Sequence, residues 1–118
     1  MAIVTPETGL FDDPTTPAIY AATAENKNPK IAIIIVNWKK YDFTLKCIKS
    51  VLNSSFKNFK IILIDNEYQK SMSDQLKKSK KIHLIRNKKN EGFASANNQG
   101  IKYSIKNGFD YMLLLNND

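Results

Sequence analysis

The sequence predicts an α/β fold with a three-layer α/β/α arrangement, in which helices cover both faces of a mainly parallel sheet. From Ile31 onward, short runs of apolar and β-branched residues alternate with longer stretches in which apolar residues recur at helical spacing. The first of these runs, 31–36, is uninterrupted, which is typical of a parallel strand buried on both faces. Alternating strands and helices favour a parallel sheet with right-handed crossovers.

Residues 1–30 differ in composition from the rest of the chain. They contain all four prolines, many threonines and alanines, and no helical periodicity. Because such a segment buries little apolar surface, we expect residues 1–30 to be an extended or disordered N-terminal segment, such as a tag or a foreign lead. Within it the sequence predicts only a short strand at Ala2–Thr5 and a turn at Asp12–Pro14. Residues 31–118 are expected to form one partial domain.

Four strands are predicted in the remaining residues, each of ordinary strand length and rich in apolar side chains. They span residues 31–36, 59–65, 81–86 and 110–115. The third strand alternates apolar with polar residues, which favours a place near an edge of the sheet. We therefore expect a Rossmann-like sheet of about four strands.

Helices are predicted in the connections between these strands. Asp42 or Thr44 can cap the first helix. Residues 67–79 are polar and are expected to hold one short helix, whereas the last helix spans 94–106 and Gly108 is placed to end it. Apolar residues recur at helical spacing on the first and last helices and are expected to face the sheet: Leu45, Ile48, Leu52, Ile101 and Ile105.

Size and composition limit the classes of function. At 118 residues, the chain is at most one domain by the usual size of about 100–200 residues. No apolar run approaches the roughly 18–20 residues of a membrane span, and the N-terminus lacks the pattern of a secretory signal. Cys47 is the only cysteine, which excludes an internal disulfide, and we expect it to be buried on a helix. These features favour a cytoplasmic location, with the inner face of the cell membrane as a second site.

The chain is basic, with a net charge of +7, and Arg86 is its only arginine. A basic balance is compatible with a nucleic acid, an anionic membrane surface or a phosphorylated substrate as partner. The lysines are scattered in pairs, which is more typical of solvated faces and loop rims. Arginine richness and interleaved aromatic residues are absent, so no nucleic acid is expected as a partner. Peripheral association with a membrane stays open.

Polar side chains follow each predicted strand. Because ligands bind beyond the carboxyl ends of the strands in open parallel sheets, these side chains mark the expected site. They are Asn37 and Trp38 after the first strand, Asp65, Asn66 and Glu67 after the second, Arg86, Asn87, Asn90, Glu91 and Gly92 after the third, and Asn116, Asn117 and Asp118 after the fourth. Strand ends also lead to solvent, so position alone does not separate a binding site from a solvated edge.

The types of side chain suit a nucleotide and a metal. Asp65 could accept a hydrogen bond from a base or a sugar hydroxyl, and Asn37 could pair with the edge of a pyrimidine. Trp38 could stack on an aromatic ring, although a lone tryptophan is more often part of the core. Asp118 is an oxygen ligand of the kind that hard divalent metals prefer, and a diphosphate would supply further oxygens.

A small, polar helix start at Gly92–Asn98 could approach a ligand closely, and its N-terminal end would favour an anionic phosphate. No P-loop and no G-x-G-x-x-G motif occurs, which disfavours a mononucleotide kinase and a dehydrogenase. His83 lies within a strand pattern, where a lone histidine is more typically a surface or half-buried residue than a catalytic one.

Four blocks of sequence resemble the inverting family 2 glycosyltransferases of GT-A fold, in particular their rhamnosyltransferase-like branch. The resemblance spans 31–118 and matches the nucleotide-sugar-binding, N-terminal half of that family. The blocks are Ile33-Ile34-Ile35-Val36-Asn37-Trp38, Ile62-Leu63-Ile64-Asp65-Asn66, Arg86-Asn87 with Asn90-Glu91-Gly92-Phe93-Ala94-Ser95-Ala96-Asn97-Asn98-Gln99-Gly100, and Tyr111-Met112-Leu113-Leu114-Leu115-Asn116-Asn117-Asp118. Each block is weak alone, but the third and fourth together at this spacing are specific.

The resemblance implies a role for each matching residue. Asn37 and Asp65 would line the base and ribose pocket of a dTDP- or UDP-linked sugar. Asn90, Gly92, Phe93 and Asn97 would shape the nucleotide-sugar site, and Trp38, Asn66 and Asn116 are counted with these nucleotide-sugar-binding residues. Asn116 and Asp118 take the outer positions of the DxD motif, with Asp118 binding the Mg²⁺ or Mn²⁺ that bridges the diphosphate. The family builds cell-wall or surface polysaccharides by transferring the sugar to a glycan or lipid-linked acceptor.

The sequence departs from the family pattern at three places. Asn116 replaces the first aspartate of DxD, so metal binding would rest mainly on Asp118, and Glu67 stands where many relatives have glycine or serine. The acceptor-binding half and the catalytic base of the family would lie beyond Asp118. We therefore expect little transferase activity from these 118 residues alone, and a nucleotide-binding module without turnover is the alternative to a transferase.

Overall fold

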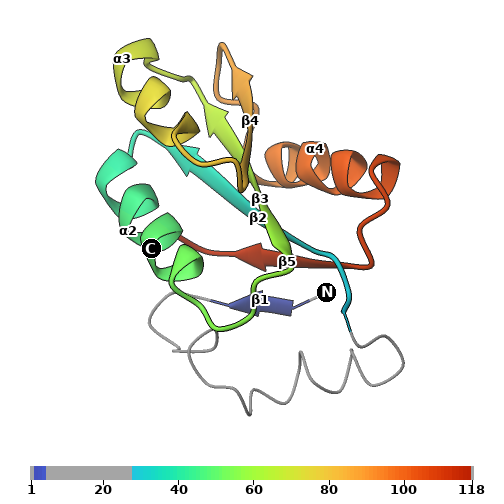
Figure 1. Cartoon of the computed structure of the whole chain (residues 1–118). Helices are drawn as coiled ribbons and strands as arrows, with labels where there is room; N and C mark the ends of the chain where they lie inside the picture. The colour runs from blue at the N-terminus through green and yellow to red at the C-terminus, as the bar shows by residue number, and fades with distance from the viewer. Residues whose placement is uncertain (1, 5–27, 118) are drawn as a thin grey trace.

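The computed structural model describes residues 2–4 and 28–117 of the chain (Figure 1). Nine elements follow one another along these residues, and strands alternate with helices from Ile31 onward. They are β1 (Ala2–Val4), β2 (Ile31–Trp38), α2 (Tyr41–Leu52), β3 (Phe59–Asn66), α3 (Lys70–Ser73), the 3₁₀ helix η2 (Asp74–Lys77), β4 (Ile82–Asn87), α4 (Phe93–Lys106) and β5 (Tyr111–Leu115).

The strands form one sheet of five strands in the order β1-β5-β2-β3-β4, and every pairing is parallel. The predicted parallel α/β fold is confirmed, and β1 adds a fifth strand beside β5 (Figure 1). It lies where the sequence predicts a short strand, whereas the turn predicted at Asp12–Pro14 lies outside the described residues. The alternating strand β4 is at the edge, as its pattern indicates.

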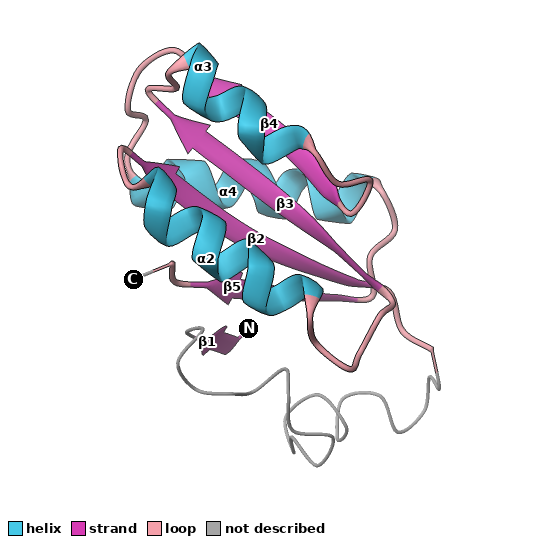
Figure 2. Ribbon diagram, turned by 60° about the vertical axis from the view of Figure 1, so that its left-hand side comes forward, coloured by secondary structure: helices cyan, strands magenta, loops and turns pink. Residues whose placement is uncertain are grey.

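Helices cover both faces of the sheet, so the predicted three-layer arrangement is confirmed (Figure 2). Alternate residues of β2 and β3 point to opposite faces, as the pleat of a strand requires. Ile33, Ile35 and Leu63 pack beneath α2, together with Leu76 of η2. Ala32, Ile34, Ile62 and Ile64 pack on the other face with Ala96 of α4. The central strands are therefore buried on both sides.

The first long helix, α2, begins at Tyr41 rather than at a side-chain cap. Its N-terminal flanking residue is Lys40, and no side chain caps the helix, so the predicted cap by Asp42 or Thr44 is wrong. Thr44 instead turns its side chain into the buried face, where it is fully buried and hydrogen-bonded. Cys47 is buried on the same helix, as predicted.

On α4 the buried face differs from the predicted one. It consists of Ala96, Asn97, Gly100 and Ser104, and Ile105 is 67% exposed, so the prediction that Ile105 faces inward is wrong. The small residue Gly100 lets the helix approach the sheet, and this contact fixes the rotation of the helix about its axis. Ile101 packs at the border of the core, and Gly108 follows the helix end with a φ of 72°.

In the part of the chain that the structure describes, no helix is long and apolar enough to cross a membrane.

Candidate functional site

A cavity of about 270 Å³ opens at the carboxyl edge of the sheet. Six residues that the resemblance assigns to the nucleotide-sugar site line it, and they come from the ends of β2 and β3, the start of α4 and the segment after β5. They are Trp38, Asn66, Asn90, Gly92, Phe93 and Asn116. Val36, Lys40 and Asn117 complete the lining. Residues distant in sequence therefore meet at the edge where ligands bind in parallel α/β sheets.

Trp38 forms part of the cavity wall rather than part of the core. The side chain is 47% exposed, and Trp38 is the last residue of β2. The Lys39 ammonium lies 5.1 Å from the centre of the indole ring. The sequence leaves open whether Trp38 stacks on a ligand or belongs to the core. The structure agrees with an exposed indole that is available for stacking and not with a core residue.

A ladder of side-chain amides reaches the cavity through Asn66 and Asn90. We name it the amide ladder: Gln99, Asn87, Asn66 and Asn90. Asn87 and Gln99 exchange two hydrogen bonds, of 2.7 and 3.0 Å. Asn87 Nδ2 also donates to Asn66 Oδ1 at 2.7 Å, and Asn66 Nδ2 donates to Asn90 Oδ1 at 3.2 Å. Each bond fixes which way the next amide points. The ladder therefore fixes the orientation of the Asn66 amide at the cavity.

The ladder ends at the start of α4. Asn90 Oδ1 accepts a hydrogen bond of 2.9 Å from the backbone N–H of Gly92, which flanks the helix with φ 86° and ψ 161°. These backbone angles are essentially restricted to glycine. No acidic residue occurs in the first turn of α4, and Gly92 and Phe93 line the cavity. The positive end of the helix dipole thus borders the cavity and favours an anion there.

The structure places Asn37 and Asp65 away from the cavity, although the sequence places them in the nucleotide pocket. Both side chains are fully buried on the face that α2 covers, the same face as Ile35 and Leu63. Asn37 Nδ2 donates to Asp65 Oδ1 at 2.9 Å, and the Tyr41 hydroxyl lies 3.1 and 3.0 Å from the two carboxylate oxygens. Because neighbouring residues in a strand face opposite sides, Trp38 and Asn66 reach the cavity and the residues before them do not.

Tyr41 joins this buried cluster to the loop after β3. Its hydroxyl accepts a hydrogen bond of 2.9 Å from the backbone N–H of Gln69. Burial raises the pKa of Tyr41 above its ordinary value of 10.0, the Gln69 N–H opposes this, and the neighbouring Asp65 raises it further. The tyrosine therefore stays neutral and can donate to Asp65.

Asn97, another predicted site residue, does not line the cavity. Only 6% of it is exposed, and its Nδ2 donates to the carbonyl oxygen of Phe93 at 3.1 Å. The bond closes the first turn of α4, so Asn97 stabilises the helix start that borders the cavity.

The described part of the fourth sequence block also reaches this site. Asn116 and Asn117 line the cavity, and Asn117 Nδ2 donates to Thr44 Oγ1 of α2 at 2.7 Å. Asp118 lies outside the described residues.

The geometry agrees with what a comparison with known proteins finds. Residues 32–118 match the family described as Glycosyl transferase family 2. The chain belongs to this family. Its predicted membership is thereby confirmed, and the match covers all four blocks in full.

Several curated relatives carry glycosyltransferase names. The chain is 36% identical over 94 residues to an uncharacterized glycosyltransferase of Rickettsia bellii and 40% identical over 79 residues to one of Rickettsia conorii. These matches cover 78% and 64% of this chain but 13% of each relative. It is 30% identical over 92 residues to the dTDP-rhamnosyl transferase RfbF of Shigella flexneri, covering 77% of this chain and 30% of that protein. The chain thus spans a small part of the length of these relatives.

Within residues 2–4 and 28–117, no group of three or more His, Cys, Asp or Glu side chains could hold a metal. The described side-chain oxygens that line the cavity belong to the amides of Asn66, Asn90, Asn116 and Asn117. Mg²⁺ is commonly bound by one or two carboxylates together with waters and substrate phosphates, and the described lining by itself supplies none of these carboxylates.

Sequence reasoning missed five residues that build the site: Lys40, Tyr41, Thr44, Asn117 as a tether, and Gln99. Lys40 and Asn117 line the cavity. Thr44 is hydrogen-bonded to Asn117, Gln99 to Asn87 of the amide ladder, and Tyr41 to the backbone N–H of Gln69. Asn66 and Asn87 occupy paired positions of β3 and β4, so the strand-end rule could have indicated their contact. Nothing in the sequence pattern pairs Thr44 with a residue 73 positions away.

Proposed function

We propose that the chain binds the nucleoside diphosphate part of a nucleotide sugar in the cavity, and that the parent enzyme transfers the sugar with inversion to a glycan or lipid-linked acceptor. One observation supports this above the others. In a family 2 domain, the cavity joins an exposed indole, an oriented amide and a helix N-terminus at one sheet edge. These groups suit a base, its polar edge or ribose, and an anionic diphosphate respectively.

In this proposal, each wall of the cavity has one task. Trp38 stacks on the base, and Asn66, held by the amide ladder, hydrogen-bonds the base or the ribose. The N-terminus of α4 at Gly92 and Phe93 faces the diphosphate. Asn116 and Asp118 hold Mg²⁺ or Mn²⁺, with Asp118 as the carboxylate ligand. When bound, the metal would neutralise charge on the departing diphosphate.

The proposed donor is linked to dTDP or UDP. The named activity of the Shigella flexneri relative supports dTDP, because its printed name includes that nucleotide. For the parent enzyme we further propose a role in cell-wall or surface polysaccharide synthesis, in the cytoplasm or at the inner face of the cell membrane.

A second candidate is a nucleotide-binding module without turnover. It is favoured by the lining of the cavity, because none of the described residues that form it is Asp, Glu or His. Inverting transfer needs a base that deprotonates the acceptor hydroxyl. Asp65 precedes the lining residue Asn66, but its buried carboxylate already accepts hydrogen bonds from Asn37 and Tyr41.

Isothermal calorimetry of the 118-residue chain with dTDP and UDP, each with and without Mn²⁺, tests the proposal. We expect binding that Mn²⁺ strengthens and that Asp118→Ala weakens to the metal-free level. Absence of binding under all conditions would contradict the donor-site proposal. Incubation with the matching nucleotide sugar and product analysis then separates the candidates, because the module binds but yields neither transfer nor hydrolysis.

A further inference from the structure

The amide ladder has both of its ends on α4. Gly92, which directly precedes this helix, donates its backbone N–H to Asn90 Oδ1 at 2.9 Å. Gln99, about two turns further along the helix, exchanges hydrogen bonds of 2.7 and 3.0 Å with Asn87. Asn66 at the end of β3 connects these two halves. One continuous helix therefore holds the ladder at both ends.

A single backbone N–H sets the direction of the hydrogen bonds along the ladder. The Gly92 N–H can only donate, so the atom of Asn90 that it meets is the carbonyl oxygen Oδ1. This oxygen also accepts from Asn66 Nδ2, which leaves Asn66 Oδ1 to accept from Asn87 Nδ2. Asn87 Oδ1 in turn accepts from Gln99 Nε2. Each amide therefore has one orientation that satisfies both of its neighbours.

Asn90 is the member of the ladder that is best placed to meet a ligand. It is exposed and lines the cavity, whereas Asn66 also lines the cavity but is only 1% exposed. Because Asn90 Oδ1 already accepts from two donors, the polar atom that Asn90 offers to a ligand is Nδ2, with its N–H groups. Such a group suits an oxygen acceptor, and a charged acceptor gives the stronger hydrogen bond.

The position of Asn90 beside the start of α4 makes the diphosphate the matching acceptor. In the proposed function, the N-terminus of α4 at Gly92 and Phe93 faces the diphosphate, and Asn90 is hydrogen-bonded to this same Gly92. From Gln99 through Asn87 and Asn66 to Asn90, each side-chain N–H donates toward the next residue. Hydrogen bonds in series polarise one another, so the series strengthens the donor at its end.

Gln99 is the first donor of this series. Without its Nε2, Asn87 Oδ1 loses the partner that holds it, and the Asn87 amide is free to turn its oxygen toward Asn66. Asn66 is almost fully buried, so an oxygen that faces another oxygen there is unfavourable. The mismatch is relieved only if Asn66 and then Asn90 change orientation.

We propose that Gln99 is a positioning residue for nucleotide binding, an inference that rests on the proposed function. Through Asn87 and Asn66, it keeps the N–H groups of Asn90 available to an oxygen of the diphosphate. Gln99 is not among the residues that line the cavity, so its effect reaches the nucleotide through the ladder.

The first test compares the wild type with Gln99→Met and Gln99→Glu. Methionine is similar to glutamine in length and helix propensity, but it cannot donate to Asn87 and its thioether is a weak acceptor. An ionised glutamate accepts but cannot donate. We expect each variant to weaken dTDP and UDP binding about 2–10-fold in calorimetry, which corresponds to one neutral hydrogen bond. The fold-change should be the same with and without Mn²⁺.

Two further variants separate positioning from other effects. Asn98→Glu is the matched control for the added charge, because Asn98 is the exposed neighbour of Gln99 on α4 and lies outside the ladder. It should weaken binding less than Gln99→Glu does. Asn87→Ala interrupts the ladder, so Gln99→Met should cause no further loss of affinity in that background.

A second readout uses the nucleotide-free chain and reports on the ladder directly. In nuclear magnetic resonance spectra, the side-chain NH₂ signals of Asn66 and Asn90 should shift in Gln99→Met and stay close to their wild-type positions in Asn98→Glu. Unchanged signals in Gln99→Met, or nucleotide affinity equal to that of the wild type, would overturn this inference alone. A wild-type chain that binds neither dTDP nor UDP would overturn the proposed function and this inference with it.

Discussion

Gly100 of α4 lies so close to Ile34 of β2 that a Cβ atom on the glycine would be 2.7 Å from Ile34 Cγ2. The same atom would be 3.1 Å from Ile64 Cδ1 of β3. Real Cβ atoms essentially never approach so closely, so one of the packed elements would have to move. The contact sets the distance between α4 and the sheet, and with it the place where the helix N-terminus meets the cavity.

Gly100→Ala should therefore destabilise the fold despite the higher helix propensity of alanine. Overpacking costs about 1–3 kcal/mol, which exceeds the roughly 1 kcal/mol that alanine gains in a helix interior. Urea denaturation followed by circular dichroism measures the change. Ser95→Ala, on the exposed side of the same helix, is the control and should leave stability equal or slightly higher. Ile34→Ala should lower the free energy of unfolding less in the Gly100→Ala background than in the wild type, because it removes the side chain that the new Cβ meets. Equal losses in the two backgrounds would contradict the proposed clash.

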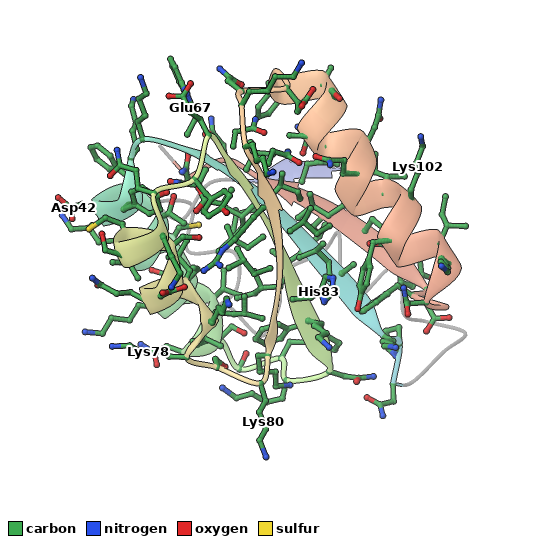
Figure 3. All side chains as sticks on the ribbon, turned by 90° about the horizontal axis from the view of Figure 1, so that it is seen from above. Asp42, Glu67, Lys78, Lys80, His83 and Lys102 are labelled. Carbon is green, nitrogen blue, oxygen red and sulfur yellow. The ribbon has the colours of Figure 1, made fainter. Side chains whose placement is uncertain are left out.

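Lys39 and Glu67 follow paired positions of the neighbouring strands β2 and β3, and both adopt the left-handed conformation, with φ values of 61° and 51° (Glu67 is labelled in Figure 3). Their side chains form an ion pair of 3.2 Å in which both are about half exposed. Such a pair contributes at most about 1 kcal/mol, whereas the left-handed conformation costs a residue other than glycine roughly 1–2 kcal/mol. Glycine would adopt the conformation of Glu67 without this cost.

Substitution at position 67 should thus follow backbone preference rather than charge. Glu67→Gly should retain or raise the free energy of unfolding, because the gain in the backbone offsets the lost ion pair. Glu67→Val should lower it by about 1–2 kcal/mol, since a β-branched residue is especially disfavoured there. Thermal and urea denaturation of the wild type, Glu67→Gly and Glu67→Val measure their relative free energies of unfolding. A valine variant as stable as the glycine variant would refute the explanation.

The order of strands and helices follows from the sequence, because it rests on the spacing of apolar residues. The predicted strand 31–36 nevertheless stops short of β2, which continues through Asn37 and Trp38. A buried asparagine breaks an apolar pattern, and only its partners Thr44 and Asp65 make its burial favourable. Those partners are brought together by the fold, so a local pattern cannot reveal them.

The site could be predicted only in part for a related reason. The strand-end rule identifies Trp38, Asn66 and Asn116, all of which line the cavity. It does not distinguish the two faces, because the uninterrupted apolar runs of β2 and β3 carry no alternation from which a face could be read. The rule therefore predicts Asn37 and Asp65 in the pocket, although both side chains lie on the face that α2 covers.

Trp38→Ala should weaken nucleotide binding by the loss of one stacked base. Stacking of a base on an aromatic side chain contributes about 1–3 kcal/mol, so the dissociation constant for dTDP or UDP should rise roughly 5–150-fold. Trp38→Phe should retain most of the affinity. Phe43→Ala is a matched control, because Phe43 is 49% exposed at the same edge but borders a separate recess on the α2 side. Equal losses in Trp38→Ala and Phe43→Ala would argue against stacking.

His83 of β4 gives the fold a pH-dependent contact on the α4 face (Figure 3). Its ring stacks on that of Tyr103 with 3.9 Å between centroids. Partial burial lowers the pKa of His83 from its ordinary 6.5, and the nearby Lys60 lowers it further. Because the folded protein favours the neutral ring, the stabilising contribution is fully present above pH 6.5 and is lost as the pH falls through the lowered pKa.

The chain contains one histidine, so its ring protons give a single titration curve by nuclear magnetic resonance. We expect a pKa below 6.5 in the folded chain, and Lys60→Gln should move it part of the way back, since burial is the larger cause. His83→Phe keeps an aromatic ring against Tyr103 but cannot be protonated, so its unfolding free energy should fall less between pH 7 and pH 5 than that of the wild type. A folded-state pKa at or above 6.5 would contradict the assigned cause, because a stacked, partly buried imidazole beside a lysine disfavours the charged form.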